Sequence, residues 1–269
     1  AYRTRSSGLF MAAGMDHRVL EGTASDPPHI LSEGDWTRVV YRFDVKQDQT
    51  IKLVKYLAYH HDAGEPAPEL IFRTVETLEQ AADRGVATAL AEQRSFVEDF
   101  WTGGDVRVEG APLLQQAVRF NLFQLLQASA RVEGHSIPAK GLTGRGYDGH
   151  YFWDAEIYVM PFLTYVAPHL AKNLLRHRYD MLEKARQRAH EVNEKGALFP
   201  WRTISGDEAS AYYAAGTAQY HINADIAYAL LRYVRTTGDT DFLARQGAEI
   251  LVETARLWAS LGFFSARQG

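Results

Sequence analysis

The segment GRGYDGHYFWDAEIYVMPF, residues 144–162, combines a glycine-rich loop, aromatic rings and carboxylates in a way that suits a sugar. A pyranose packs its C–H bonds on an aromatic plane, while its hydroxyl groups donate to carboxylate oxygens. Phe152 and Trp153 begin the helix that follows the loop, and Asp154 and Glu156 fall in its first turn. First-turn acids also complement the helix dipole. Their combination with the loop and the rings favours a ligand site.

A second candidate segment is ALFPWRTISGDEAS, in which Trp201 follows a proline in an irregular loop. The ring has two interpretations, because a tryptophan in such a loop either fills the core or forms a platform for a ligand. Arg202 comes next in the sequence. We expect its guanidinium either to pair with Asp207 or to bind an anion.

A third candidate segment, AQYHINADIAYAL, carries His221, Asn223 and Asp225 near the start of an apolar helix. His221 and Asp225 are four residues apart, so they share a helix face and either orient one another or bind a metal. His150 and Asp154 have the same spacing. A metal site needs three or four ligands that converge from separate elements, and we therefore predict no metal.

The elements that hold these segments follow from hydrophobic periodicity. Residues 36–60 alternate apolar and polar side chains around a QDQT turn, which predicts a β-hairpin at the end of a larger β domain. Residues 62–69 contain prolines, a glycine and acids, which indicate a linker. Helical periodicity follows at about 69–101, 111–133, 152–166, 168–191, 217–236 and 239–262. Gly238 ends one of these helices, and Asp239 or Thr240 is the N-cap of the next. Long helices joined by functional loops favour a bundle or toroid with the site at one end.

Composition narrows the class of protein. The chain has 269 residues, is 46% hydrophobic and 23% charged, and carries a formal net charge of −4, which is typical of a globular protein with a sizeable core. Its 29 basic residues are scattered, so we predict no nucleic-acid partner. The chain has no cysteine, which excludes disulfides and thiolate chemistry and is compatible with the cytoplasm. The apolar run IYVMPFLTYV covers about half a membrane span, so we predict no membrane segment.

Four segments together resemble glycoside hydrolase family sixty-five, which contains the disaccharide phosphorylases for maltose, trehalose and kojibiose. They are KGLTGRGYDGHYFWDAEIYVMPF, ALFPWRTISGDEAS, QYHINADIAYALLRYVRTTGDTDFL and EILVETARLWAS. The resemblance implies a mainly α chain. Residues 1–62 are then the end of an N-terminal β-sandwich domain, residues 63–106 a helical linker, and residues 107–269 the N-terminal part of an (α/α)6 catalytic barrel.

The resemblance also implies a reaction. Similar enzymes invert: a glutamic acid protonates the glycosidic oxygen while inorganic phosphate attacks the anomeric carbon, which gives β-glucose 1-phosphate. The partners of the protein are then a disaccharide and phosphate, without a cofactor. Trp153 and Asp154 correspond to the pair that holds glucose in the family's F-W-D-x-E motif, and we expect both side chains to project into one central hollow.

Further residues correspond to the wall of the same pocket. The implied substrate-binding set is Trp153, Asp154, Glu156, Trp201, Arg202, Gly141, Leu142 and Thr143, with Tyr151, His150, His221 and Asn223 in support. The sequence departs from the family at Arg202, where many relatives have an acid, and at Ala155, where a threonine is usual. The first departure leaves the particular disaccharide undetermined and an anionic sugar open.

The family's general acid lies in a later segment of the G-P-D-E-Y kind, which we expect beyond Gly269. The chain alone is therefore expected to be inactive. Its parent is expected to be a cytoplasmic disaccharide phosphorylase of the glycosidase and glycosyltransferase type and, like many relatives, a homodimer. Three alternatives stay open: hydrolysis by water in the same pocket, a non-catalytic carbohydrate-binding module, and a helical scaffold without a ligand.

Overall fold

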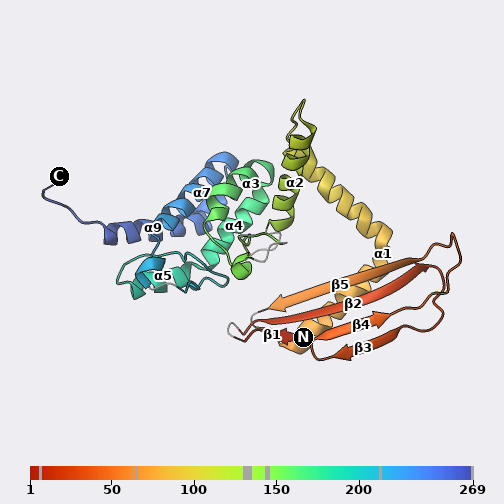
Figure 1. The fold of residues 1–269 in the computed structure, drawn as a ribbon. Coiled ribbons are helices and arrows are strands. Elements are labelled where there is room, and N and C mark those ends of the chain that lie inside the picture. The colour runs from red at the N-terminus through yellow and green to blue at the C-terminus, as the bar shows by residue number, and fades with distance from the viewer. Residues whose placement is uncertain are drawn as a thin grey trace. The chain divides into compact units, whose positions relative to one another are not determined.

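The computed structural model describes residues 1–5, 8–62, 64, 66–129, 135–142, 146–211 and 214–267 and, of residues 214 and 215, the backbone alone. The chain divides into two compact units, Ala1–Glu98 and Asp99–Gly269 (Figure 1). The first unit combines strands with the beginning of a long helix, and the second unit is helical. In the described part of the chain, no helix has both the length and the apolar character needed to cross a membrane.

The first unit contains two antiparallel sheets. Its strands are β1 (Tyr2–Arg3), β2 (Phe10–Glu21), β3 (His29–Glu33), β4 (Trp36–Val40) and β5 (Lys52–Asp62). Strand β2 lies between β1 and β5 in the larger sheet, and β3 pairs with β4 in the smaller one. The hairpin predicted for residues 36–60 is therefore wrong in its pairing, because β4 and β5 belong to different sheets. The partner of β5 is β2, a strand distant in sequence that local alternation does not reveal.

Helix α1 (Ala67–Gly104) packs its first part on the larger sheet. Gly14 of β2 permits this close approach, because a Cβ atom there would lie 2.8 Å from Cγ2 of Thr74 and 2.9 Å from Cδ1 of Leu78. The helical backbone is interrupted at Gly85, which has φ 75° and ψ 160°. Glycine adopts this conformation without the steric cost that a side chain would add. The predicted helical linker of residues 63–106 contains this kinked helix.

The second unit continues with eight further α-helices and three irregular helical turns among the described residues. The α-helices are α2 (Pro112–Ala128), α3 (Met160–Val166), α4 (Pro168–Asp180), α5 (Leu182–Glu191), α6 (Ala214–Thr217), α7 (His221–Thr237), α8 (Thr240–Phe242) and α9 (Ala248–Leu261). The turns are the 3-10 turn η1 (Gly146–Gly149) and the π-helical turns η2 (Ala155–Val159) and η3 (Leu243–Gly247). Three predicted helices are divided in the structure. Residues 152–166 contain η2 and α3. Residues 168–191 form α4 and α5, and residues 239–262 form α8, η3 and α9.

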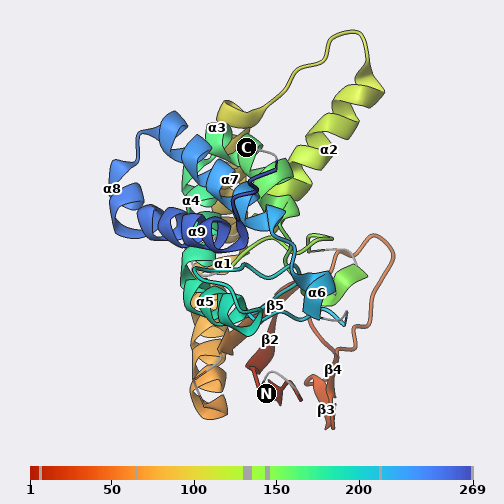
Figure 2. The ribbon, with the colours of Figure 1, turned by 90° about the vertical axis from the view of Figure 1, so that its left-hand side faces the viewer.

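The core of the second unit lies where α3, α4 and α7 pack together, as both Figure 1 and Figure 2 show. Leu163 of α3, Leu174 of α4 and Ile226 of α7 are fully buried, and burial of one such side chain contributes about 1.5–3 kcal/mol. The predicted break after α7 is confirmed. Gly238 ends the helix with φ 72°, and the Asp239 carboxylate caps α8 by accepting a backbone hydrogen bond of 3.0 Å.

Candidate functional site

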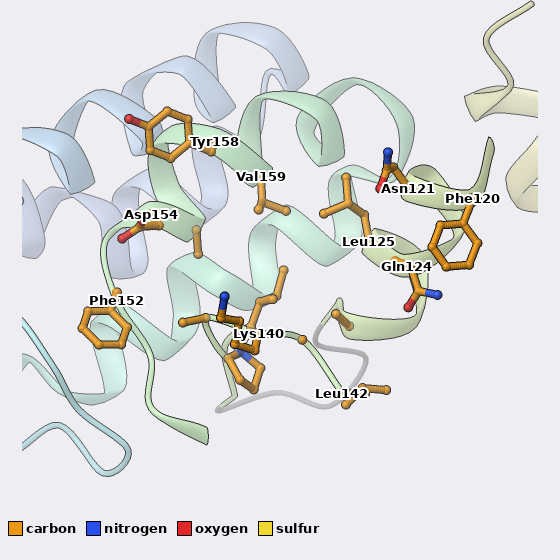
Figure 3. Close-up of a pocket in the computed structure, with 16 residues that line it drawn as sticks. Phe120, Asn121, Gln124, Leu125, Lys140, Leu142, Phe152, Asp154, Tyr158 and Val159 are labelled. Carbon is orange, nitrogen blue, oxygen red and sulfur yellow. The ribbon is translucent and has the colours of Figure 1, made fainter. Parts of the chain in front are cut away.

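A cavity of about 650 Å³ opens in the second unit between α2, residues 137–142 and the start of the η2–α3 helix. Figure 3 shows Phe152 and Asp154 on one side of it, side chains of α2 on the other, and Lys140 between them. The polar lining groups are Asn121, Gln124, Lys140 and Asp154, and the rest of the wall is mainly apolar and aromatic. Such a mixed lining suits a ligand that has both hydroxyl groups and a C–H face.

The chain passes from an extended loop into a helix at the edge of this cavity. Tyr151 forms antiparallel bridges with Pro138 and with Thr203, and its amide donates to the Thr203 carbonyl at 2.7 Å. Burial raises the pKa of the Tyr151 hydroxyl. The helical bonds begin where the Glu156 amide donates to the Trp153 carbonyl at 3.0 Å. Two neighbouring loops thus fix the place at which the helix starts.

Asp154 and Trp153 point in different directions. Asp154 is exposed and lines the cavity, and its carboxylate has no hydrogen bond or ion pair with the residues that the structure describes. Trp153 is half-buried against the core, and its ring centre lies 5.0 Å from that of His221 and 6.0 Å from that of Tyr158. Successive helical residues project about 100° apart. Of the two side chains expected in one hollow, Asp154 lines this cavity, whereas Trp153 packs against the core and is not among the lining residues.

Glu156 occupies the core side of the same turn and is 1% exposed. Its Oε1 accepts from Nε of Arg178 at 2.7 Å, and its Oε2 accepts from Nη2 at 2.9 Å. Arg178 is itself 1% exposed, and its Nη2 also donates to the Phe152 carbonyl at 3.3 Å. Both carboxylate oxygens are thus engaged. The structure places Glu156 in a buried ion pair and not among the residues that line the cavity.

Trp201 stands in a loop that Glu208 holds in place. The Glu208 carboxylate accepts from the backbone amides of Trp201 at 2.7 Å, Arg202 at 3.3 Å and Ser210 at 3.0 Å. The Trp201 ring packs against the core and meets Phe152 edge-on, with ring centres 6.4 Å apart. The indole therefore supports a cavity-lining ring from behind and does not itself line the cavity.

Arg202 binds the loop that contains η1. Its Nη2 donates to the Asp148 carboxylate at 3.1 Å and lies 3.1 Å from Nδ1 of His150. Of the two alternatives for Arg202, the pairing with Asp207 is wrong, because Asp207 instead accepts from Lys184 of α5 at 2.6 Å. This hydrogen bond holds the pKa of the Asp207 carboxyl below its ordinary value. Arg202 and His150 thus lie next to each other at the η1 turn, where Asp148 forms an ion pair with the Arg202 guanidinium.

The prediction that His221 and Asp225 orient one another is confirmed, since Nδ1 and Oδ2 lie 2.8 Å apart. Within the described ranges, the His, Asp and Glu side chains form no group of three or more that could hold a metal ion. Asn223 is fully buried. Its side chain donates to the Ala197 carbonyl at 2.7 Å and accepts from the Phe199 amide at 3.2 Å. It thereby anchors the segment that leads into the loop of Trp201, the tryptophan loop.

Gly141 and Leu142 both line the cavity, and Thr143 lies outside the described residues. Gly141 has φ 60°, and its amide donates to the Pro138 carbonyl at 2.8 Å, which closes a tight turn at the cavity wall. A left-handed backbone of this kind is costly for other residues. Leu142 is 68% exposed, so its side chain contributes an apolar edge that remains open to solvent.

The opposite wall was not predicted from the sequence. It comes from α2, where Asn121 and Gln124 present amide groups to the cavity beside Phe120 (Figure 3). The signal was their spacing of three residues, which places both amides on one helix face. That signal was weak, because the dominant pattern of this helix is its apolar face. Lys140 also lines the cavity and was not among the predicted site residues.

Comparisons with known proteins cover almost the whole chain. Residues 1–100 match the glycosyl hydrolase family 65 N-terminal domain, and residues 119–269 match the central catalytic domain of that family. An α,α-trehalose phosphorylase of Thermoanaerobacter brockii is 45% identical over 267 residues, which are 99% of this chain and 34% of the relative. A kojibiose phosphorylase of the same organism is 35% identical over 244 residues, which are 86% of this chain and 31% of the relative.

A solved structure from the human microbiome, provisionally assigned as a kojibiose phosphorylase, superposes with a TM-score of 0.85 at 26% identity. The superposition covers 99% of this chain and 35% of that one. The chain thus spans about a third of the length of the relatives that it matches. Because the catalytic-domain match alone extends over more than half of its residues, the chain belongs to glycosyl hydrolase family 65.

Proposed function

We propose that the protein to which this chain belongs is an inverting glycoside phosphorylase that cleaves an α-linked glucose disaccharide with phosphate. The observation that carries the proposal is the Asp154 carboxylate, which faces the cavity and has no partner within the described residues. Phe152 lines the cavity close by. An acceptor for hydroxyl groups beside an aromatic ring is what a bound glucose unit needs.

In the proposed reaction, inorganic phosphate is the co-substrate and no cofactor takes part. A glutamic acid from outside residues 1–269 donates its proton to the glycosidic oxygen as the bond between that oxygen and the anomeric carbon breaks. A phosphate oxygen forms the new bond to the anomeric carbon from the opposite face, so the configuration inverts. The products are β-glucose 1-phosphate and a free sugar. Asp154 holds hydroxyl groups of the glucose unit while these bonds change.

The same proposal gives the helices of the second unit a role. Residues 107–269 supply the first part of an (α/α)6 barrel, whose loops at one end form the floor of the glucose site. The agreement with the solved relative over 99% of this chain supports this arrangement. Residues 1–62 belong, in this proposal, to an N-terminal β-sandwich domain, consistent with the two antiparallel sheets of the first unit.

We further propose trehalose as the disaccharide. Of two phosphorylases from one organism, the trehalose enzyme is 45% identical to this chain and the kojibiose enzyme 35%. A neutral sugar is also favoured by Arg202, because its guanidinium pairs with Asp148. The protein is proposed to act in the cytoplasm as a homodimer. The absence of cysteine is compatible with that compartment.

The test is to incubate the full-length protein with trehalose, kojibiose or maltose, with and without phosphate, and to follow the products by NMR. We expect β-glucose 1-phosphate from trehalose only when phosphate is present. Release of free glucose at the same rate without phosphate would identify a hydrolase instead. Binding of trehalose without turnover under any condition would identify a carbohydrate-binding module.

Asp154→Asn tests the site itself. Hydrogen bonds to a charged group contribute about 1.5–3 kcal/mol, so kcat/KM for trehalose should fall about ten- to hundred-fold. Asp241→Asn is the matched control, because Asp241 is also an exposed acid in the first turn of a helix, away from the cavity. Equal activity of the Asp154→Asn and Asp241→Asn variants would remove Asp154 from the glucose site.

A further inference from the structure

Arg178 holds the chain on both sides of the Trp153–Asp154 pair. From α4, its guanidinium donates two hydrogen bonds of 2.7 and 2.9 Å to the Glu156 carboxylate and one of 3.3 Å to the Phe152 carbonyl. Phe152 stands immediately before the pair, and Glu156 stands two residues after Asp154. One side chain therefore ties together the two ends of a short segment whose middle residue, Asp154, faces the cavity.

Stability alone does not account for this arrangement. Arg178 and Glu156 are each 1% exposed, and removing two charges from water costs several kcal/mol before their attraction offsets it. Apolar side chains of similar volume often replace such a pair without loss of stability. Apolar side chains do not, however, reproduce the directed hydrogen bonds of the ion pair. A guanidinium fork that meets a carboxylate through two parallel hydrogen bonds fixes both the distance and the relative orientation of the groups.

The segment between the two anchor points needs such a constraint. Asp154 has helical backbone angles, φ −53° and ψ −33°, and its side chain makes no capping hydrogen bond. The helix that follows it begins with the π-helical turn η2, which is less regular than an α-helical turn. Rotation of this first turn by a few degrees would move the Asp154 carboxylate relative to the cavity wall. Arg178 opposes that rotation from the core side.

We propose that Arg178 is a positioning residue, which sets the direction of the Asp154 carboxylate and thereby the affinity of the cavity for the glucose unit. The inference rests on the proposed function, because it assumes that Asp154 contacts the sugar. Arg178 itself does not line the cavity, because its side chain is buried in the core. Its effect on the reaction must therefore pass through the segment that it holds.

The test compares variants of the full-length protein that separate charge burial from geometry. Arg178→Met leaves Glu156 as an unpaired buried charge and should destabilise the fold. The double variant Glu156→Leu with Arg178→Met removes both charges, so its melting temperature should return close to that of the unmodified protein. Its kcat/KM for trehalose should nevertheless stay at least about ten-fold lower, mainly through a higher KM. Recovery of activity together with stability would overturn the inference.

A second arm asks whether Arg178 acts through Asp154. Asp154→Asn and the double variant should each lower kcat/KM, and their combination should be no worse than the more severe of the two. A combined loss equal to the product of the separate losses would show independent action and overturn the inference while leaving the proposed function intact. No loss on Asp154→Asn alone would overturn the inference and remove Asp154 from the glucose site, while the phosphate dependence of the products still tests the proposed reaction. Arg186→Met is the control, because Arg186 also joins two helices through Glu249 and Glu253 but lies away from the cavity, so activity should be unchanged.

Discussion

Asn223→Ala should loosen the segment that leads into the tryptophan loop. The Asn223 side chain is fully buried and joins α7 to that segment by two hydrogen bonds. It donates to the Ala197 carbonyl at 2.7 Å and accepts from the Phe199 amide at 3.2 Å. Both partners belong to residues that are themselves fully buried. Alanine leaves a backbone donor and a backbone acceptor without partners in a place that water does not reach.

The expected cost follows from those two groups. A buried polar group that loses its partner costs about 1–3 kcal/mol, and partial relaxation of the segment lowers the sum for the pair. A local destabilisation of about 2–4 kcal/mol is therefore expected. The weaker contact of Asn223 with the Thr254 hydroxyl, at 3.4 Å, adds little. Unlike a change at the cavity, this loss should be independent of substrate.

Native-state hydrogen exchange measures this effect at a site that the substitution does not touch. The Leu198 amide donates to the Ala185 carbonyl at 2.8 Å and reports opening of the segment. A loss of 2–4 kcal/mol should accelerate its exchange about 30- to 700-fold. Asn121→Ala, at an exposed position of α2, is the control and should leave it unchanged. Equal protection of Leu198 in the Asn223→Ala and Asn121→Ala proteins would refute the reasoning.

Two further predictions concern backbone conformation and pH. Gly196→Ala should prevent α9 from packing in its place, because at φ 79° the added Cβ would collide with the Glu253 carbonyl. Gly238→Ala has φ 72° and open space around it, so it should cost only about 1 kcal/mol of stability. The melting temperatures of the two variants distinguish these outcomes. The Lys172 ammonium lowers the pKa of Asp239 to about 2. A depressed folded pKa contributes stability that is present above the unfolded value of about 3.9 and is lost as pH falls toward 2. Asp239→Asn should therefore flatten the decline of melting temperature between about pH 4 and 2, and an unchanged decline would contradict the assignment.

The helices were predictable because their signals are local. The apolar periodicity of α7 and the Gly238–Asp239 break each depend on residues within a few turns of one another. The strand pairing was not predictable in the same way. Strands β4 and β5 have the alternation of a hairpin, yet β5 pairs with β2, which lies more than thirty residues before it in the chain. Pairing between strands so far apart in the sequence depends on tertiary packing, such as that of α1 against Gly14, and not on the turn between neighbouring strands.

The sequence was enough to predict Asp154 as part of the candidate site, but not the residues that support it. Phe152, Asp154 and Tyr158 stand close together in the sequence and all line the cavity, so this part of its wall could be expected. Arg178 could not be identified in this way. It follows Arg176 by two residues in a run of mixed apolar and basic side chains, and only the packing of α4 decides that Arg178 is the buried one. The missed wall of α2 has the same cause, because Asn121 faces the cavity only once the helix has docked.

The two acids at the helix start divide two tasks that one carboxylate could not combine. Glu156 is neutralised by Arg178 inside the core, so it can fix the backbone but cannot receive a ligand. Asp154 projects from another side of the same turn, where water solvates its charge. In the proposed function, sugar hydroxyl groups replace that water. A site that binds a neutral, strongly hydrated ligand gains affinity when its acceptor is held in the bound orientation beforehand. Burial of the Arg178–Glu156 pair costs desolvation free energy. In the inference drawn above, the pair in return holds the exposed Asp154 carboxylate in its orientation.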